Sequence, residues 1–111
     1  MKVAKGVKIT ELALGEGEVA ETGKIVTIHY RGFLNKGELF RSSYDDGQPI
    51  SFRIGKREVV AGLEKGVVGM RVGGKRRIRV SPHLAYRDQP VTGIPPNAVL
   101  IFEVELLAIQ D

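Results

Sequence analysis

The sequence predicts an α+β domain in which an antiparallel sheet wraps on one short helix. Three observations support this fold class. Apolar residues recur with a period of two in most patterned segments, a single segment has the spacing of an amphipathic helix, and no repeat or low-complexity tract divides the chain. A chain of 111 residues buries roughly two-thirds of its unfolded surface on folding. We therefore expect residues 1–111 to form a single domain.

The first predicted strands lie in the N-terminal part of the chain. The segment Val7–Leu14 alternates weakly, whereas Ile25–Gly32 alternates clearly and is apolar on both faces near Ile25. This second strand is therefore expected near the centre of the sheet. A turn follows at Asn35–Gly37, where glycine can adopt a positive φ.

The remaining strands are predicted over Ile50–Ile54, Arg71–Val80 and Val99–Ile109. In the second of these, Arg76 falls among apolar positions and is expected at the margin of the sheet. The third is the longest. Its inward face is expected to carry Leu100, Phe102, Val104 and Leu106.

One helix is predicted over Glu58–Val67, where Val59, Leu63 and Val67 recur every four residues. Gly62 in its interior is about 1 kcal/mol less favourable than alanine. A short helix with this weakness needs a packing partner, and the inward face of the sheet is the expected one.

Composition excludes several kinds of site. The chain contains no cysteine, which excludes disulfides and thiolate metal ligands. Its two histidines, His29 and His83, have no carboxylate cluster nearby in sequence, so no metal site is expected. Gly15–Gly17 lacks the following helix of a dinucleotide motif, so no cofactor is expected either.

Length and hydropathy argue against a membrane partner. The longest apolar run, Ala98–Phe102, is far too short to span a bilayer. The N-terminal Met1–Gly6 lacks the apolar stretch of a secretory signal. We therefore expect a cytoplasmic protein. The absence of long heptad patterns favours a monomer.

The basic segment Arg71–Arg79 carries five cations, and the net charge of the chain is +4. A nucleic-acid partner would gain from such charges, but no aromatic residues are interleaved for base stacking. Glu103 and Glu105 could neutralise part of this face if their strand pairs with it. A nucleic-acid partner is therefore not expected, and salt-dependent retention on heparin would be needed to support one.

Several short motifs occur in a fixed order along the chain. They are Ile28–Gly32, Gly37–Phe40, Phe52–Gly55, Glu58–Leu63, Pro82–Tyr86, Ile94–Ala98 and Leu100–Leu107. With these motifs in register, the chain resembles FKBP-type peptidyl-prolyl cis-trans isomerases, the immunophilins that bind tacrolimus and rapamycin. The resemblance extends from about Gly6 to Ile109.

The resemblance implies an FKBP-like fold, in which an antiparallel sheet of five to six strands forms a half-barrel around one short helix, with a pocket between sheet and helix. It also implies proline-containing peptides and unfolded proteins as substrates. It assigns catalysis to Tyr30, Phe40, Tyr86 and Phe102. It assigns substrate binding to Tyr30, Phe40, Arg41, Ile50, Phe52, Val59, Val60, Leu63, Tyr86, Ile94 and Phe102. The hydroxyl of Tyr86 and the backbone N–H of Val60 are the implied donors to substrate carbonyls.

Four residues depart from the family pattern. Leu63 stands where many members have tryptophan, Ile50 replaces an aromatic residue, and Arg87 replaces a glycine after Tyr86. Arg41 reverses the charge of a usual aspartate. Its side chain could swing into solvent or lie over the rim of the pocket. We expect reduced isomerase activity and a larger loss of macrolide affinity. The alternative is a weakly active or inactive module that binds proline motifs or acts as a chaperone, although the chain has no inserted flap domain.

Overall fold

The computed structural model describes residues 6–89, 91 and 93–110. Residues 1–5, to which most of the signal-peptide argument applies, lie outside this range. The elements in order are β1 (Val7–Ala13), β2 (Ile25–Leu34), β3 (Leu39–Ser42), β4 (Ile50–Arg53), α1 (Ala61–Val67), β5 (Lys75–Val80), a 3₁₀ turn (Pro82–Leu84) and β6 (Leu100–Gln110). Six strands and one short helix confirm the predicted fold class. No helix within the described ranges is long and apolar enough to cross a membrane.

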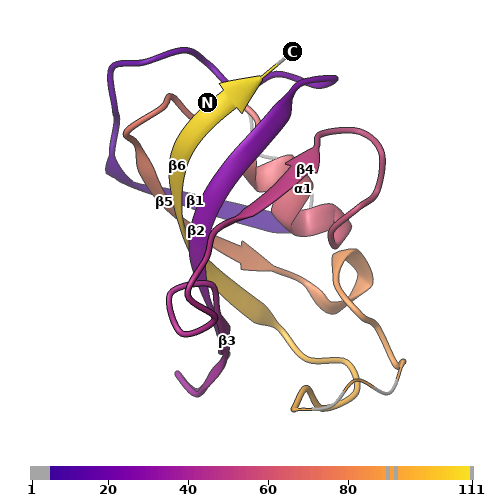
Figure 1. Cartoon of the computed structure of the whole chain (residues 1–111). Helices are drawn as coiled ribbons and strands as arrows, with labels where there is room; N and C mark the ends of the chain where they lie inside the picture. The colour runs from indigo at the N-terminus through magenta and orange to yellow at the C-terminus, as the bar shows by residue number, and fades with distance from the viewer. Residues whose placement is uncertain (1–5, 90, 92, 111) are drawn as a thin grey trace.

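The sheet is antiparallel and runs in the order β1-β5-β6-β2-β3, with β4 also paired to β2 (Figure 1). β2 pairs with β6 along its whole length, from Ile25–Gln110 to Leu34–Leu100. Its other edge is shared by β4, opposite Ile25–Ile28, and β3, opposite Arg31–Phe33. The predicted central position of this strand is therefore confirmed. Because β3, β4 and β6 all pair with β2, these three strands border the same central strand.

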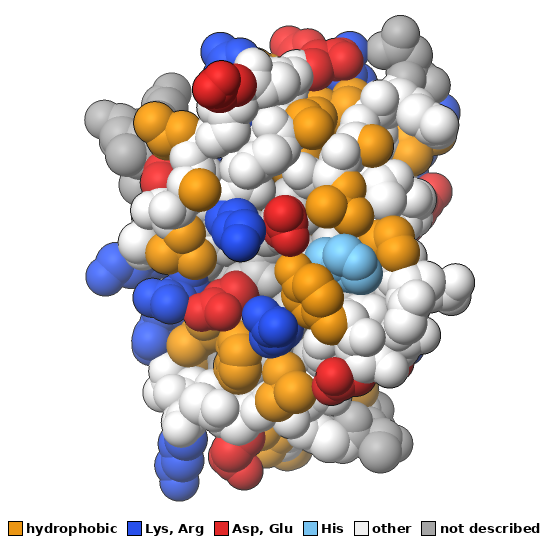
Figure 2. Space-filling view, turned by 60° about the vertical axis from the view of Figure 1, so that its left-hand side comes forward, with side chains coloured by type: hydrophobic (Ala, Val, Ile, Leu, Met, Phe, Trp, Pro, Cys, Tyr) orange, Lys and Arg blue, Asp and Glu red, His pale blue; other side chains and the backbone are white. Residues whose placement is uncertain are grey.

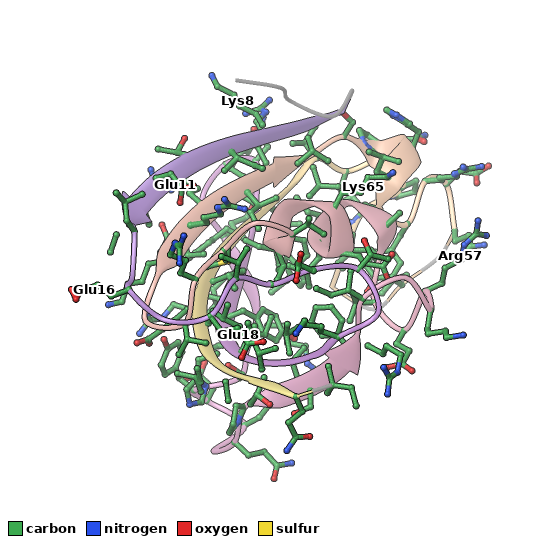
Figure 3. The ribbon with its side chains drawn as sticks, turned by 90° about the horizontal axis from the view of Figure 1, so that it is seen from above. Lys8, Glu11, Glu16, Glu18, Arg57 and Lys65 are labelled. Atoms are coloured by element: carbon green, nitrogen blue, oxygen red, sulfur yellow. The ribbon has the colours of Figure 1, made fainter. Side chains whose placement is uncertain are left out.

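The sheet curves around α1, as the view from above shows (Figure 3). Two helical glycines make this contact close. A Cβ atom on Gly62 would lie 2.1 Å from Cγ1 of Val80, and one on Gly66 would lie 2.5 Å from Cγ2 of Ile78. Only glycine fits at these positions while the helix keeps this distance. The cost of Gly62 to the helix is therefore offset by close packing on β5.

The helix begins at Ala61, so its predicted start at Glu58 is wrong. Val60 has an extended ψ of 145°, and its carbonyl accepts hydrogen bonds from the N–H groups of Leu63 and Glu64. β-branched residues such as Val59 and Val60 lose side-chain freedom in a helix. Glu58 instead accepts a hydrogen bond from the backbone N–H of Arg53, at 3.0 Å, which ties this segment to β4.

Arg76 does not lie at the margin of the sheet, which corrects the prediction. It lies on the inward face of β5 and is 8% exposed. Its guanidinium donates to both carboxylate oxygens of Glu11 on β1, and its Nη1 donates at 2.8 Å to the carbonyls of Gly66 and Val68. Carbonyls at a helix end lack helical partners. Arg76 donates hydrogen bonds to two such carbonyls and so connects α1, β1 and β5.

On the outer face of the sheet, acidic residues of β6 lie opposite basic residues of β5. β5 begins at Lys75 rather than Arg71, because residues 71–74 form a turn in which Gly73 has a φ of +91°. Arg77 pairs with Glu103 at 2.8 Å, and Lys75 lies opposite Glu105 in the register. On the face seen in Figure 2, basic and acidic side chains are interspersed. The prediction that acidic residues of the pairing strand neutralise part of this face is confirmed for Arg77 and Glu103.

Replacing Gly62 with alanine is expected to destabilise the domain by about 1–3 kcal/mol, because the new methyl group overlaps Val80. Urea unfolding would measure this loss. The Gly62→Ala/Val80→Ala double variant is the control, since removing the valine methyl groups makes room for the alanine. The double variant should lose less stability than the sum of the single variants. Strictly additive losses would contradict the packing argument.

Candidate functional site

An aromatic cup lies where β2, β3 and β6 meet. It consists of Tyr30, Phe40 and Phe102, and we use this name below. The ring centroids of Tyr30 and Phe102 are 6.1 Å apart, and those of Phe40 and Phe102 are 6.0 Å apart with the rings edge to face. Gly32 allows the Phe40 ring to lie across β2, since a Cβ there would be 2.6 Å from the ring. Such tilted aromatic pairs form stable walls.

The other predicted apolar residues pack in the same cluster. Phe52, Leu63 and Ile94 are buried and lie beneath the surface, whereas the partly buried residues reach the opening. The partly buried predicted residues are Phe40, Ile50, Val59, Val60 and Tyr86. The structure thus brings together side chains from four strands, the helix and the segment before β6. Their roles in catalysis and binding stay predictions.

Arg41 lies beside the cup, and its side chain remains largely exposed. Its Nε lies 3.5 Å from Oδ2 of Asp46, and the side chain of Arg41 is 65% exposed. Burial raises the pKa of Tyr30 above its usual 10.0, and the positive charge of Arg41 opposes that rise. The guanidinium therefore lies near enough to Tyr30 to act on its hydroxyl.

Asp46 was not predicted as a site residue. The pair Asp45–Asp46 indicates a turn before Gly47, and the structure has that turn, with a φ of +79° at the glycine. The turn also carries Asp46 back to Arg41 on the rim. No local pattern in the sequence identifies this pair, because it forms only when the turn folds back onto β3.

The rim is fixed to β2 by Ser43, whose side chain is fully buried. Its Oγ accepts from the Tyr30 N–H at 2.7 Å, and its own N–H donates to the Tyr30 carbonyl at 3.0 Å. Nδ1 of His29 lies 2.8 Å from the same Oγ. His29 therefore has a structural partner, and the segment that follows β3 is held beside Tyr30.

Two predicted donors lack protein acceptors. Among the described residues, none accepts a hydrogen bond from the N–H of Val60 or from the hydroxyl of Tyr86. Tyr86 lies near enough to Tyr30 to raise the pKa of that phenol. Val60 packs against the core cluster that contains Tyr30 and Phe102. Both donors therefore remain available to the carbonyl oxygens of a peptide.

The loop after Tyr86 is held by Arg87. This residue has a φ of +54°, a conformation that favours glycine, which the family pattern has here. Its N–H donates to the Pro82 carbonyl at 3.0 Å, and its Nε donates to the His83 carbonyl at 3.1 Å. These bonds hold the loop despite the unfavourable conformation. Pro90 and Thr92, within the same loop, lie outside the described residues.

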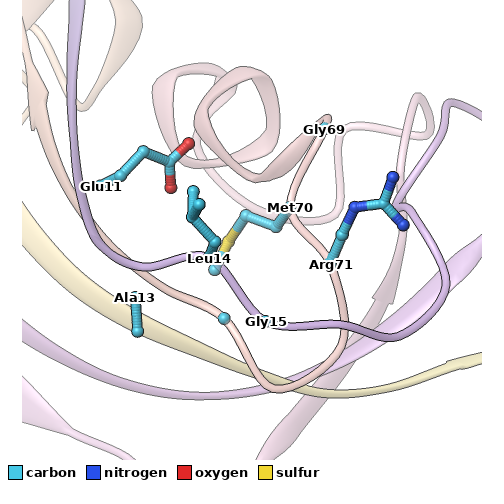
Figure 4. Close-up of a pocket in the computed structure, with 8 residues that line it drawn as sticks. Glu11, Ala13, Leu14, Gly15, Gly69, Met70 and Arg71 are labelled. Carbon is cyan, nitrogen blue, oxygen red and sulfur yellow. The ribbon is translucent and has the colours of Figure 1, made fainter.

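A second hollow, of about 190 Å³, lies between β1 and the segment after α1 (Figure 4). Leu14 and Met70 lie between Glu11 on one side and Arg71 on the other. Arg76 engages the Glu11 carboxylate, and Arg71 donates to the Gly17 carbonyl at 3.1 Å. These charges serve the fold. In the described part of the chain, no three histidine or acidic side chains gather as metal ligands.

Replacing Arg41 with glutamine should raise the pKa of Tyr30 further, because the opposing positive charge is lost while burial remains. Titration of the tyrosine ¹³Cζ resonances would measure this change. Arg31→Gln is the matched control. The Arg31 guanidinium lies 4.4 Å from the Tyr44 ring centroid and lowers the pKa of Tyr44. Arg31→Gln should therefore raise the pKa of Tyr44 and leave the pKa of Tyr30 unchanged. An unchanged pKa of Tyr30 in Arg41→Gln would indicate that the wild-type guanidinium points into solvent, away from Tyr30.

Comparisons with known proteins agree with this geometry. The model of the FKBP-type peptidyl-prolyl cis-trans isomerase family matches residues 16–107. FK506-binding protein 1A of Neurospora crassa is 41% identical over 107 residues, which cover 95% of this chain and 89% of that protein. FK506-binding protein 4 of Aspergillus oryzae is 46% identical over 110 residues, and this chain spans only 23% of its length. The crystal structure of AtFKBP13 superposes with a TM-score of 0.87 at 36% identity, covering 95% of this chain and 94% of that one. The chain therefore belongs to the family of FKBP-type peptidyl-prolyl cis-trans isomerases.

Proposed function

We propose that this chain accelerates rotation about Xaa-Pro bonds in peptides and unfolded proteins, without covalent chemistry and without a cofactor. The observation that carries this proposal is the aromatic cup, with two unpaired donors, Val60 N–H and Tyr86 O–H, beside it. A proline ring is apolar and has no N–H, so it can enter such a cup without leaving a buried donor unpaired.

The reaction requires only that the amide twist. Rotation destroys amide resonance and has a barrier of about 18–20 kcal/mol. The twisted amide is less polar than the planar one. A cup that replaces water with aromatic side chains therefore disfavours the planar ground state more than the transition state. A thousandfold acceleration requires a reduction of only about 4 kcal/mol.

The two donors orient the peptide during rotation. Val60 N–H lies at the start of α1, and Tyr86 O–H lies in the loop before β6, so they can hold carbonyls on either side of the proline. Tyr30, whose ring forms part of the cup, supplies a third O–H. Each group binds a carbonyl without transferring a proton.

A second candidate function is binding of proline motifs with little catalysis. Arg41 is the observation that favours it, because a long cation on the rim can hold a peptide while hindering its release. The same cup would serve both functions. Exchange measurements distinguish them, since a binding module shifts peptide resonances without accelerating cis-trans interconversion.

Two-dimensional NMR exchange on an Ala-Leu-Pro-Phe peptide would test catalysis directly. We expect accelerated exchange with catalytic amounts of protein, a modest loss in Tyr86→Phe and a heavy loss in Phe40→Ala and Phe102→Ala. The tyrosine contributes one hydrogen bond, worth about 1 kcal/mol, whereas each phenylalanine forms a wall of the cup. Equal losses in all three variants would indicate unfolding, and circular dichroism would check this. No acceleration by the folded wild-type protein would contradict the proposed function.

Tacrolimus should bind the cup and block this exchange, as the names of the FK506-binding relatives suggest. We expect weakened binding because Arg41 covers part of the rim. Arg41→Asp alone would place a carboxylate beside Asp46, so Arg41→Asp/Asp46→Arg is the appropriate variant. It retains an ion pair with reversed polarity and should bind the macrolide more tightly and isomerise faster. Isothermal titration and the exchange assay measure the two effects, and no change in either would show that Arg41 does not limit the site.

A further inference from the structure

We propose that Arg41 makes this site selective for prolines that adjoin an acidic residue. The inference rests on the proposed isomerase function and names the substrate class of that same site. It follows from where the arginine lies, from how weakly it is engaged, and from the balance of charge at the mouth of the cup.

Arg41 is the charged residue closest to the aromatic cup along β3. It follows Phe40 directly, so the two Cα atoms are about 3.8 Å apart. The Phe40 ring packs edge to face on Phe102, while the Arg41 guanidinium reaches the Tyr30 hydroxyl on the next strand. A peptide whose proline occupies the cup therefore brings the neighbouring residue within reach of this guanidinium.

An open hollow of about 500 Å³ adjoins the cup at this point. Its lining comes from β3 and the following turn: Leu39, Phe40, Arg41, Ser42, Asp45 and Asp46. Ser43 fixes the turn to the backbone of Tyr30, so the hollow keeps its place relative to the cup. It is large enough to admit the side chain of a residue next to the proline.

The guanidinium can accept a substrate carboxylate without losing its present partner. Its contact with Asp46 runs through Nε at 3.5 Å, and the two side chains are 65% and 48% exposed. Exposed pairs of this kind contribute little. Arginine carries five N–H donors in a planar fork, which suits a carboxylate. Asp46 engages only part of that fork, so a glutamate or aspartate of the substrate can bind beside it.

Charges of both signs line the hollow, and Arg41 is the one nearest the cup. Asp45 and Asp46 line the same hollow, and Asp46 lies 3.5 Å from Arg41. Arg41 follows Phe40 directly, whereas the two aspartates belong to the turn after β3, and Arg41 acts more strongly than Asp46 on the Tyr30 hydroxyl. A substrate carboxylate beside the proline therefore meets the guanidinium before it meets the aspartates. The net charge of +4 on the whole chain also favours an acidic peptide.

The test uses two peptide series, Ala-Xaa-Pro-Phe and Ala-Ala-Pro-Xaa, with glutamate, glutamine or lysine as Xaa. Glutamate and glutamine have nearly the same shape and differ in charge. We expect kcat/KM from NMR exchange to be about two- to fivefold higher for glutamate than for glutamine in at least one series, as an exposed ion pair would give. Lysine should fall below glutamine. The preference should shrink between about 20 mM and about 500 mM salt, because the charges are exposed.

Three variants assign the preference to Arg41. Arg41→Gln should bring the glutamate-to-glutamine ratio to one. Arg41→Asp/Asp46→Arg keeps an ion pair on the rim and should make lysine the preferred residue. Arg79→Gln removes the same charge from the outer face of the sheet, where Arg79 donates to Asn35, and should keep the wild-type ratio. A ratio that persists in Arg41→Gln, or disappears in Arg79→Gln, would overturn the assignment.

The proposal and the function on which it rests fail differently. If wild-type protein accelerates the glutamine peptides and shows no preference for glutamate, the selectivity is wrong and the isomerase function stands. If no peptide is accelerated, the isomerase function is wrong, and dissociation constants from chemical-shift titration replace kcat/KM. Equal affinities for the glutamate and glutamine peptides would then overturn the selectivity, whereas tighter binding of glutamate that Arg41→Gln removes would support it.

Discussion

The close packing of α1 on β5 is the constraint on which the rest of the structure depends. Gly62 and Gly66 present bare backbone to Val80 and Ile78, so the helix lies nearer the sheet than any side chain would permit. Arg76 holds the far end by donating to the last carbonyls of the helix and binding Glu11. Val60 directly precedes α1, so the position of the helix also fixes where the unpaired N–H of Val60 lies. A helix displaced outward by one methyl group would move that donor with it.

The same sheet separates an apolar inner face from an outer face on which charges of both signs lie. β2 pairs with β6, β3 and β4, which places three aromatic rings from different strands against one another. On the outer face, Arg77 pairs with Glu103, and Lys75 lies opposite Glu105 in the register. Part of the basic strand therefore has acidic neighbours on β6.

Sequence patterns predicted most of the fold because period-two alternation reports directly on which face is buried. The inward set of β6 and the central place of β2 follow from that rule, and the structure has both. Errors arose where a local pattern was overridden by a distant contact. The helix start moved to Ala61 because Val60 is extended, and Arg76 is buried because Glu11, 65 residues away, meets it. Asp46 could not be assigned from its neighbours, because its partner depends on how the turn folds back.

The proposed function and the proposed selectivity depend on different parts of the site. In the proposed function, twisting an amide depends on apolar walls, and Phe40 and Phe102 pack against each other whichever charge stands beside them. In the proposed selectivity, the choice of peptide depends on the rim, where Arg41 is exposed and weakly paired. Arg41 also acts on the Tyr30 hydroxyl, because its positive charge opposes the rise in the pKa of that phenol that burial causes. On these proposals the arginine acts mainly on which prolines enter the cup, and the rotation itself is left to the aromatic walls.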